Sequence, residues 1–325
     1  MSKSNITDQD LVDLKGKVAI VTGGNSGVGY GTVQWLARQG AKVYIAGRND
    51  ERVAAAIKKL ESEGLKGGSL HALKLDLADP RLAKQSAEDF LTKESRLDIL
   101  VNNAAIGGAD PTSLNQYGLR DIITTKKHTI SHISHFVFTE TLLPLLKKTA
   151  QEENSDVRII NVSSKVHDTI EVDSFKGKET LNKNYGDSMN DKMKTYSFSK
   201  LANILHIKHL QKQFDSENIP ITCIALHPGV VATPGMDKFF DSVGVLGRVL
   251  KVVFVPLFLL SISKGGMNSA FAAASQDIKK DRAPYKGAYL MPVGKITQPS
   301  KAALDDRLAS ELYDTTKEVL SEIGL

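Results

Sequence analysis

The chain of 325 residues is poor in cysteine and in aromatic residues. It contains one cysteine, Cys223, and one tryptophan, and aromatic residues make up only 6% of it. A single cysteine excludes intramolecular disulfide bonds and zinc clusters made of cysteines, and it suits a reducing compartment such as the cytoplasm. Because Cys223 lies in an apolar run at 221–226, we expect it to be a core side chain rather than a nucleophile.

Long hydrophobic runs are also missing. The most apolar stretch, 245–262, is interrupted by two cations and a proline, and its uncharged part at 252–263 is shorter than the roughly 20 residues of a membrane span. Residues 1–15 carry three aspartates and lack the apolar region of a secretory signal. We therefore expect a cytoplasmic protein without a membrane span, with contact at the membrane surface as an open alternative.

Positive charge is in only slight excess. The 42 lysine and arginine residues are scattered among 37 aspartate and glutamate residues, which gives a net charge of +5. A nucleic-acid site needs basic residues gathered on one face, so we predict no nucleic-acid partner. With 41% hydrophobic and 24% charged residues, the composition is typical of a soluble enzyme.

Short β-branched runs alternate with amphipathic segments along most of the chain. We predict strands at residues 17–21, 42–46, 71–75, 97–101, 157–162 and 221–226, and a last strand at 285–290. Helices are expected at 28–38, 51–63, 81–93, 120–148 and 195–214. Repeated βαβ units predict the α/β class, with a doubly wound parallel sheet (Rossmann fold) in a single domain. We place this domain at 15–274, with an apolar substrate lid at about 234–264, and a C-terminal extension at 275–325 that completes the fold.

A glycine-rich segment follows the first predicted strand and precedes a helix. Gly23 can adopt the turn, Gly27 lets the backbone approach a pyrophosphate, and Gly29 allows close packing of helix on strand. The amino end of the helix would face the anion. In this context the glycines predict a dinucleotide-binding loop rather than an ordinary turn, and we assign three further residues to it: Asn25, Ser26 and Val28.

The end of the second predicted strand indicates which dinucleotide binds. Enzymes that use NAD usually carry an acidic residue there, whereas this chain has Arg48. Together with Asn25 and Ser26, Arg48 can donate hydrogen bonds to a 2′-phosphate, which predicts NADP. The alternative is a solvent-facing arginine and a relaxed choice of cofactor, since Asp50 and Glu51 follow closely.

Further cofactor contacts are expected after the third and fourth strands. Asp76 and Leu77 would lie beside the adenine, although Asp76 is also placed to cap the helix ahead of Pro80. Asn103 and Ala104 follow the fourth strand and offer an amide and a small residue where the backbone approaches closely.

Two segments match the pattern Tyr-x-x-x-Lys: Tyr196 with Lys200, and Tyr313 with Lys317. The first pair lies on a predicted helix that follows a strand ending near Ser164, whereas the second lies in the charged tail. Residues four apart share a helix face, so the Lys200 ammonium would approach the Tyr196 ring and lower its pKa from about 10. Ser164 would hydrogen-bond the substrate oxygen. These three residues are therefore candidate catalytic groups, against the alternative of a surface pair and a loop hydroxyl.

Together the motifs resemble the short-chain dehydrogenase/reductase family over residues 15–266, in the branch of the retinol dehydrogenases and the WW-domain oxidoreductase. The resemblance implies that Tyr196 is the acid/base, that Lys200 binds the nicotinamide ribose and lowers the tyrosine pKa, and that Ser164 polarises the carbonyl. It also implies a hydride supplied by the cofactor and assembly as a homodimer or homotetramer. Further cofactor contacts are implied for Pro228, Gly229, Val231 and Thr233, the last at the carboxamide.

One position departs from the family pattern. The family carries an asparagine just before a His-x-x-His-Phe-like sequence, where it holds a water in the proton relay behind the lysine. Ser131 stands at this place and is included in our catalytic set. The shorter serine is expected to hold the water poorly, which predicts slow turnover or none.

Three nearby histidines, His128, His132 and His135, have helical spacing and share a face, a geometry that suits zinc. No carboxylate is interleaved among them as a general base. We therefore predict no metal, and neutral histidines that form local hydrogen bonds.

The predicted lid indicates the substrate, because it holds more apolar surface than a small polar molecule needs. Its large apolar residues are Phe239, Phe240, Val245, Leu246, Val252, Phe254, Leu257 and Phe258. We predict an NADP(H)-dependent oxidoreductase that interconverts a lipophilic ketone or aldehyde and its alcohol. The same lid would suit a partner subunit or a membrane surface, with Arg248 and Lys251 facing acidic headgroups. A second hypothesis, motivated by Ser131, is an NADP(H)-binding sensor or interaction protein with weak or lost catalysis.

Overall fold

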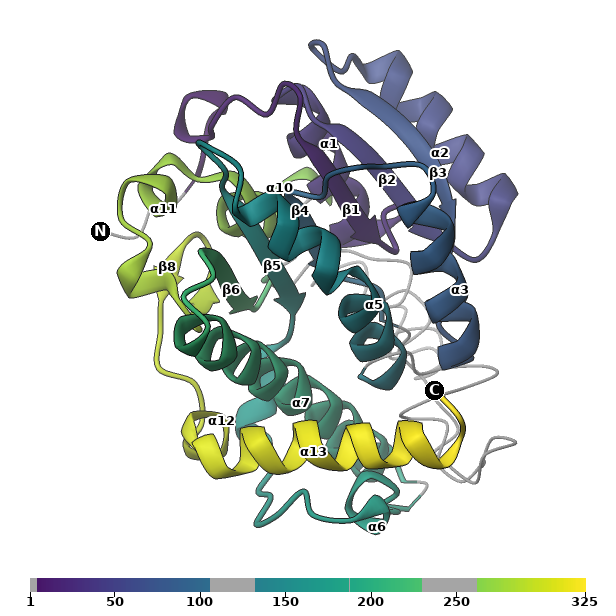
Figure 1. Ribbon diagram of the computed structural model, residues 1–325, viewed down its shortest axis with the longest axis vertical. Helices are drawn as coiled ribbons and strands as arrows, with labels where there is room; N and C mark the ends of the chain where they lie inside the picture. Colours follow the sequence, from purple (N-terminus) through teal and green to yellow (C-terminus); the bar gives the residue numbers. More distant parts are fainter. Residues whose placement is uncertain (1–4, 106–131, 187, 230–261) are drawn as a thin grey trace, which may run out of the picture.

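The computed structural model describes residues 5–105, 132–186, 188–229 and 262–325. These residues form a sheet with the strand order β3-β2-β1-β4-β5-β6-β7-β8. The strands are β1 (Val18–Thr22), β2 (Lys42–Gly47), β3 (Ser69–Lys74), β4 (Ile99–Asn102), β5 (Val157–Val162), β6 (Ile221–Leu226), β7 (Tyr289–Met291) and β8 (Lys295–Ile296). Neighbours from β3 to β7 run parallel, and only the pair of β7 and β8 is antiparallel. The predicted doubly wound parallel sheet is thus confirmed (Figure 1).

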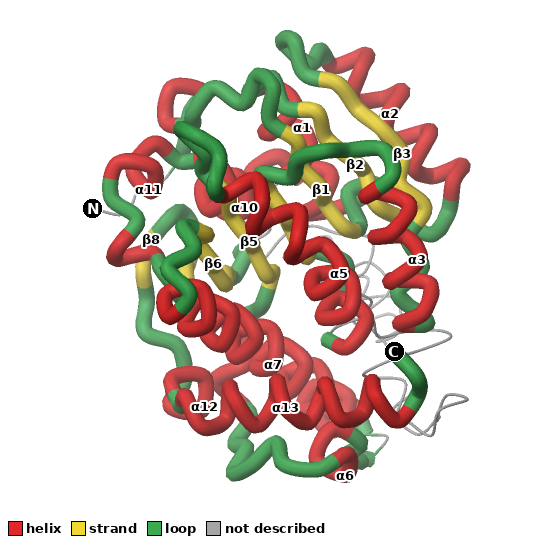
Figure 2. Tube along the Cα trace, viewed as in Figure 1, coloured by secondary structure: helices red, strands yellow, loops and turns green. Residues whose placement is uncertain are grey.

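Helices connect the parallel strands, as the alternating pattern predicted. The longer ones are α1 (Gly27–Arg38), α2 (Asp50–Glu63), α3 (Pro80–Leu91), α5 (Ile133–Ala150), α7 (Met189–Ser216), α10 (Ile262–Ala274) and α13 (Asp306–Glu322). Shorter helices are α6 (Lys178–Leu181), α11 (Gln276–Lys280) and α12 (Lys301–Leu304), with 3-10 turns η1 (Asp8–Asp10), η2 (Lys165–Thr169) and η3 (Ala283–Tyr285). Figure 2 shows the helices on both faces of the sheet.

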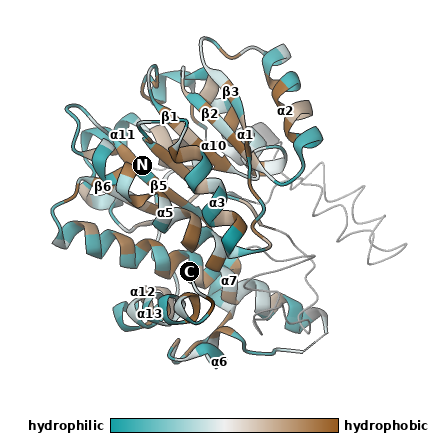
Figure 3. Cartoon of the chain, turned by 45° about the vertical axis from the view of Figure 1, so that its right-hand side comes forward, coloured by the Kyte–Doolittle hydropathy of each residue, from teal (hydrophilic) through white to brown (hydrophobic). Residues whose placement is uncertain are grey.

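Side chains alternate along the strands and build one hydrophobic core on each face. Ile20 of β1 faces a core formed with α3, α5, α7 and α13, whereas Val21 faces the other core, formed with α1, α2 and α10. The hydrophobic colouring of the central strands in Figure 3 reflects this double burial. Cys223 lies fully buried in β6, where burial raises its pKa, so the prediction of a core thiol is confirmed.

Three element predictions need correction or restriction. The last strand was expected at 285–290, but it begins at Tyr289, because Gly287 turns the chain with a φ of +68°. Helix α7 begins at Met189, ahead of the predicted start at 195, because Ser188 and Asp191 form a capping box there. Of the helix expected at 120–148, residues 120–131 lie outside the described residues, and α5 accounts for the rest.

The segment after residue 274 extends the sheet and also packs on the helices that cover it. Strand β7 pairs with β6, and α13 packs against α7. Within the described parts of the chain, no helix is both long and apolar enough to cross a membrane.

Candidate active site

The glycine loop joins β1 to α1 at the carboxyl edge of the sheet. Gly23 and Gly27 have φ values of +65° and +54°, a conformation that favours glycine. A Cβ on Gly29 would lie 2.4 Å from the Gly23 carbonyl oxygen and 2.5 Å from Asn103 Nδ2. The first of these atoms belongs to the backbone and the second to a packed side chain, so neither can move aside and only glycine fits at position 29. The loop therefore has the tight turn and the close contact that a dinucleotide site requires.

Thr22, the last residue of β1, ties this loop to the end of β4. Its hydroxyl accepts hydrogen bonds from the backbone amides of Asn103, at 3.0 Å, and Ala104, at 2.9 Å. Its carbonyl oxygen accepts from Asn103 Nδ2 at 2.8 Å. With two donors on the hydroxyl oxygen, its proton is left for His135 Nε2, at 2.9 Å. Sequence reasoning missed Thr22, although its place directly before the glycines was a signal.

The carboxyl ends of β2 and β3 carry cations. Arg48 is exposed directly after β2. Lys74 Nζ donates to the Arg48 carbonyl oxygen and to Asp50 Oδ2, both at 2.8 Å. A Cβ on Gly47 would lie 3.2 Å from Asn25 Oδ1, so the Asn25 side chain reaches this place as well. Lys74, which sequence reasoning missed, thus pairs with the carboxylate that had made the choice of cofactor doubtful.

The residues that follow β3 show whether Asp76 caps the next helix or is left free to contact the adenine. Asp79, not Asp76, caps α3 by accepting from the Arg81 amide at 2.8 Å. Asp76 Oδ1 accepts from the Ala78 amide at 2.9 Å, and the Leu77 side chain is buried in the core. The capping alternative for Asp76 is therefore wrong, and its contact with adenine stays a prediction.

Strand β5 and helix α7 bring the three candidate catalytic residues together. Ser164 follows β5, and its side chain is close enough to act on the pKa of Tyr196, while its hydroxyl oxygen accepts from the Val166 amide at 3.4 Å. Lys200 Nζ lies 5.4 Å from the centre of the Tyr196 ring and donates to the Val162 carbonyl oxygen at 3.1 Å. Lys200 is only 2% exposed, and burial lowers its pKa to about 8. The expectation that one site holds all three groups agrees with this geometry.

The electrostatics of Tyr196 differ from the expectation. Burial raises the pKa of Tyr196, and the opposing effect comes from the hydrogen bond with Ser164 rather than from Lys200. The physical reason is the burial of Lys200 itself, which lowers the lysine pKa to about 8, so the amine is neutral before the buried phenol ionises. The predicted lowering of the tyrosine pKa by Lys200 is therefore wrong for this structure.

A buried chain of amides lies behind Lys200. Asn203 Nδ2 donates at 3.1 Å to the same Val162 carbonyl oxygen that accepts from Lys200. Asn161 Nδ2 donates to the Asn203 carbonyl oxygen at 3.1 Å, and Asn102 Nδ2 donates to Asn161 Oδ1 at 2.9 Å. Asn102 and Asn161 are paired in the register of β4 and β5. This series of hydrogen bonds fixes the Val162 carbonyl group that accepts from Lys200. Sequence reasoning missed these asparagines as a support for the site.

Several predicted site residues lie outside the described residues: Ser131, Val231, Thr233 and most of the lid at 234–264. Pro228 and Gly229 are described; they follow β6, and Gly229 has a φ of +91°. The remaining loop residues lie at the start of α1, where Ser26 is the N-cap and Val28 belongs to the first turn.

The second Tyr-x-x-x-Lys match has a structural role. Tyr313 lies on α13, where its hydroxyl donates to Glu140 Oε2 at 3.2 Å. Its ring stacks on His209, with the two ring centres 3.8 Å apart. Context rather than the motif therefore distinguishes the two pairs.

Two of the three histidines considered as zinc ligands form local hydrogen bonds, as predicted. His132 Nε2 lies 3.1 Å from Thr316 Oγ1, and burial lowers the pKa of His132 to about 3. His135 contacts Thr22, and His128 lies outside the described residues. Among the residues that the structure describes, no group of three or more histidine, cysteine or acidic side chains is arranged to hold a metal ion.

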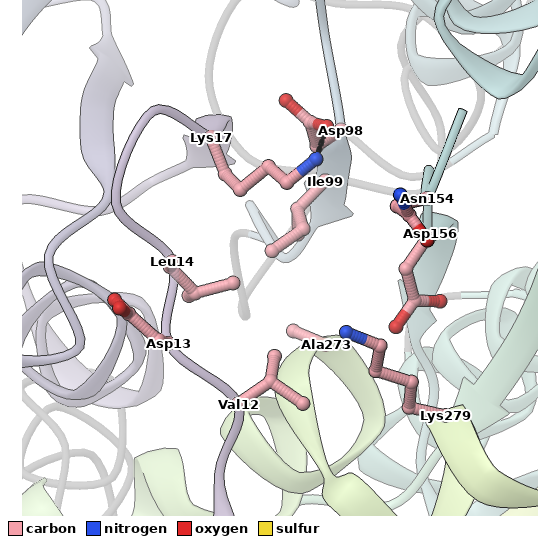
Figure 4. Close-up of a pocket in the computed structure, with 10 residues that line it drawn as sticks. All are labelled: Val12, Asp13, Leu14, Lys17, Asp98, Ile99, Asn154, Asp156, Ala273 and Lys279. Carbon is pink, nitrogen blue, oxygen red and sulfur yellow. Dashed lines mark ion pairs between the residues drawn. The ribbon is translucent and has the colours of Figure 1, made fainter. Parts of the chain in front are cut away.

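A small pocket lies at the opposite edge of the sheet (Figure 4). Its lining includes Lys17 and Asp98, which form an ion pair of 3.4 Å, and Lys279 of α11. A cavity of about 20 Å³ accommodates a water molecule but no organic substrate. It lies at the amino ends of β1 and β4 and is separate from the candidate site.

Known proteins share both the sequence and the fold. The sequence model of the family described as short chain dehydrogenase matches residues 17–171. A short-chain dehydrogenase/reductase of Armillaria gallica is 44% identical, over 99% of this chain and 98% of the relative. An uncharacterized oxidoreductase of Schizosaccharomyces pombe is 35% identical, over 98% of this chain and 88% of the relative. The crystal structure of an uncharacterized protein from Mycobacterium paratuberculosis has a TM-score of 0.70 at 25% identity and covers 98% of both chains. The chain therefore belongs to the short-chain dehydrogenase/reductase family, whose members are oxidoreductases that bind NAD(P).

Proposed function

We propose that this chain is an NADP(H)-dependent oxidoreductase that interconverts a lipophilic ketone or aldehyde and its alcohol. The observation that carries the proposal is the meeting of Ser164, Tyr196 and Lys200 at the sheet edge that also holds the glycine loop. Ligands of doubly wound sheets bind at this edge, where the strand order reverses between β1 and β4.

The loop fits a dinucleotide, because a side chain at Gly29 would fill the space that close approach of helix and strand requires. When bound, NADPH supplies the hydride. The Ser164 hydroxyl donates a hydrogen bond to the substrate carbonyl oxygen, and Tyr196 gives that oxygen the proton that completes the alcohol. The raised pKa of Tyr196 keeps its proton in place at neutral pH, which suits the direction of reduction.

Charge at the ends of β2 and β3 supports NADP over NAD. The exposed Arg48 is available to a 2′-phosphate, and Lys74 pairs with Asp50, the nearby carboxylate that would repel one. Arginine binds phosphate well because its planar donors match the oxygens.

The substrate class rests on the apolar sequence of the lid, most of which lies outside the described residues. We propose a hydrophobic carbonyl compound or alcohol as the substrate, and contact of the same lid with a membrane surface as an additional role. A homodimer or homotetramer is proposed from the family resemblance. A cytoplasmic location is proposed because a sequence with a single cysteine suits a reducing compartment.

Oxidation of NADPH, followed at the nicotinamide absorbance band across aromatic and aliphatic carbonyls of increasing length, tests the proposal. Tyr196→Phe removes the proton donor and should lower kcat by about 10²–10⁴-fold. Tyr313→Phe is the matched control, since it changes the other tyrosine of the same motif and should retain turnover. Tight NADPH binding without turnover on any carbonyl would instead support the sensor hypothesis.

A further inference from the structure

His167 contacts the backbone of the candidate catalytic serine. It lies on η2, three residues after Ser164, and its side chain is fully buried. Its Nδ1 lies 2.7 Å from the Ser164 carbonyl oxygen. A carbonyl oxygen only accepts, so Nδ1 carries the proton of this hydrogen bond. The same oxygen also accepts from the His167 backbone amide at 3.2 Å.

The other side of the ring is held by the C-terminal part of the chain. The Ser300 amide donates to Nε2 at 3.2 Å, and the Tyr289 ring packs edge-on with its centre 4.9 Å away. Asp168 Oδ1 lies 2.9 Å from the same Nε2, which can form only one of the two bonds: it accepts from the Ser300 amide when the ring is neutral and donates to Asp168 when Nε2 also carries a proton. The imidazole is therefore fixed at both nitrogens and along one edge, by residues distant in sequence from Ser164.

Fixing the Ser164 carbonyl also fixes the backbone that carries the serine side chain. Ser164 is in extended conformation directly after β5, with φ −157° and ψ 153°. The preceding residue, Ser163, is held by its amide bond to the Leu226 carbonyl oxygen at 2.7 Å. The Ser164 carbonyl oxygen accepts from both Nδ1 and the backbone amide of His167, and these two hydrogen bonds hold the ψ angle of Ser164. Because the Cα of Ser164 carries both its carbonyl group and its side chain, this backbone geometry places the serine Cβ, and the hydroxyl oxygen is then held by the Val166 amide at 3.4 Å.

We propose that His167 is a positioning residue, which orients the Ser164 hydroxyl through the Nδ1 hydrogen bond to the Ser164 carbonyl and connects it to the C-terminal extension. The inference rests on the proposed function in assigning Ser164 a role in turnover. The hydrogen bond between His167 and the Ser164 carbonyl does not depend on that role, and a spectroscopic measurement can test it without turnover.

Two amide variants separate positioning from packing. In His167→Asn the side-chain amide takes the place of Nδ1 and still donates to the carbonyl, whereas in His167→Gln it takes the place of Nε2 and does not. Both variants lose the ring packing on Tyr289. We expect His167→Gln to lower kcat at least tenfold with the NADPH Kd unchanged, and His167→Asn to stay within about threefold of the unmodified enzyme. Equal loss in both variants, or loss in neither, would overturn the proposal.

A spectroscopic test needs no turnover, so it remains decisive if no carbonyl is reduced. The Cζ chemical shift of ¹³C-labelled Tyr196, assigned with Tyr196→Phe, reports its hydrogen bond with Ser164. His167→Gln should move this shift toward its value in Ser164→Ala, and His167→Asn should leave it in place. If His167→Gln does not fold, ¹⁵N spectra of the unmodified chain still test the geometry. A His167 ring without a proton on Nδ1, or an unmoved Tyr196 shift in His167→Gln, contradicts the proposal.

Discussion

Single residues at the ends of β2 and β3 set the charge that a cofactor ribose would meet. Asp50 alone would disfavour a 2′-phosphate, but Lys74 Nζ lies 2.8 Å from its Oδ2. Both side chains are more than half exposed, and exposed ion pairs contribute only about 0–1 kcal/mol to stability. The pair therefore matters for the local charge rather than for folding.

Arg48→Asp should reverse the preference for the phosphorylated cofactor. A charge-assisted hydrogen bond contributes about 1.5–3 kcal/mol, so loss of the guanidinium should weaken NADPH binding by about 10- to 100-fold. NADH binding should stay constant or improve, because the new carboxylate can accept from the ribose 2′-hydroxyl. Fluorescence titration with both cofactors measures the ratio, and Arg52→Asp, in the first turn of α2, is the charge-matched control. An unchanged ratio refutes the role of Arg48.

Lys74→Met should weaken NADPH binding about 3- to 10-fold, because it removes one cation and leaves the Asp50 carboxylate without its partner. Adding Asp50→Asn to this variant removes the repelling charge and should restore part of the loss. Titration of the single and double variants forms a double-mutant cycle. Independent effects of the two changes would show that the ion pair has no part in cofactor choice.

The sequence predicted which candidate catalytic residues lie together better than it predicted the residues that hold them in place. Tyr196 and Lys200 share a helix face, so their spacing alone places them together. Lys74 and Asn161 depend on the register between neighbouring strands, in which Lys74 pairs with Gly47 and Asn161 with Asn102. A single sequence does not specify this register residue by residue. Spacing along the sequence was therefore enough to predict that Tyr196 and Lys200 lie together. The contacts across the sheet could be seen only in the structure.

At the scale of elements, the crossing of α1 and α10 brings two backbones together. A Cβ on Gly266 would lie 2.3 Å from the carbonyl carbon of Gly31 and 2.5 Å from the Thr32 nitrogen. Helix α10 packs beside the helix that begins at the glycine loop, so this crossing supports the cofactor side of the sheet.

Gly266→Ala should lower the free energy of unfolding by about 1–3 kcal/mol, because one added methyl group forces the two helices apart. At an open helix position the same change would stabilise the protein by about 1 kcal/mol, so the sign of the effect is diagnostic. Urea denaturation followed by circular dichroism measures it. A gain in stability would mean that the helices cross less closely than the structure shows.

Element prediction succeeded where local pattern decides and was incomplete where tertiary contacts decide. The β-branched runs predicted β5 and β6 with their exact limits. The packing of α13 was not predictable, because it depends on contacts between distant segments. Glu311 of α13, for example, accepts from the Ser174 hydroxyl and the Phe175 amide, both at 2.9 Å. Such contacts fix the segment between Ser164 and Tyr196 without leaving a periodic signal in it.

At the scale of the whole molecule, the core between α5, α7 and α13 encloses ionisable groups. His132 and His206 are buried there with ring centres 5.6 Å apart, and burial lowers the pKa of both. His227, which follows β6, has its pKa lowered to about 4 for the same reason. His132 and His227 are therefore neutral in the folded protein at pH 5 to 7, whereas an unfolded histidine has a pKa of about 6.5.

These histidines predict loss of stability in mild acid. Between pH 6.5 and the folded pKa of about 3 for His132, the unfolded chain binds a proton that the folded chain excludes. The free energy of unfolding is therefore fully retained above pH 6.5 and falls as the pH decreases below it, by about 2 kcal/mol each for His132 and His227 at pH 5. Urea denaturation at intervals from pH 7.5 to 5 measures this slope, in a range where most carboxylates stay ionised. His132→Asn keeps a polar group beside Thr316 but does not titrate, so its slope should be shallower by about one proton's contribution. If the slope of this variant equals that of the unmodified chain, His132 is already protonated in the folded state, and the buried core must provide a charged partner for it.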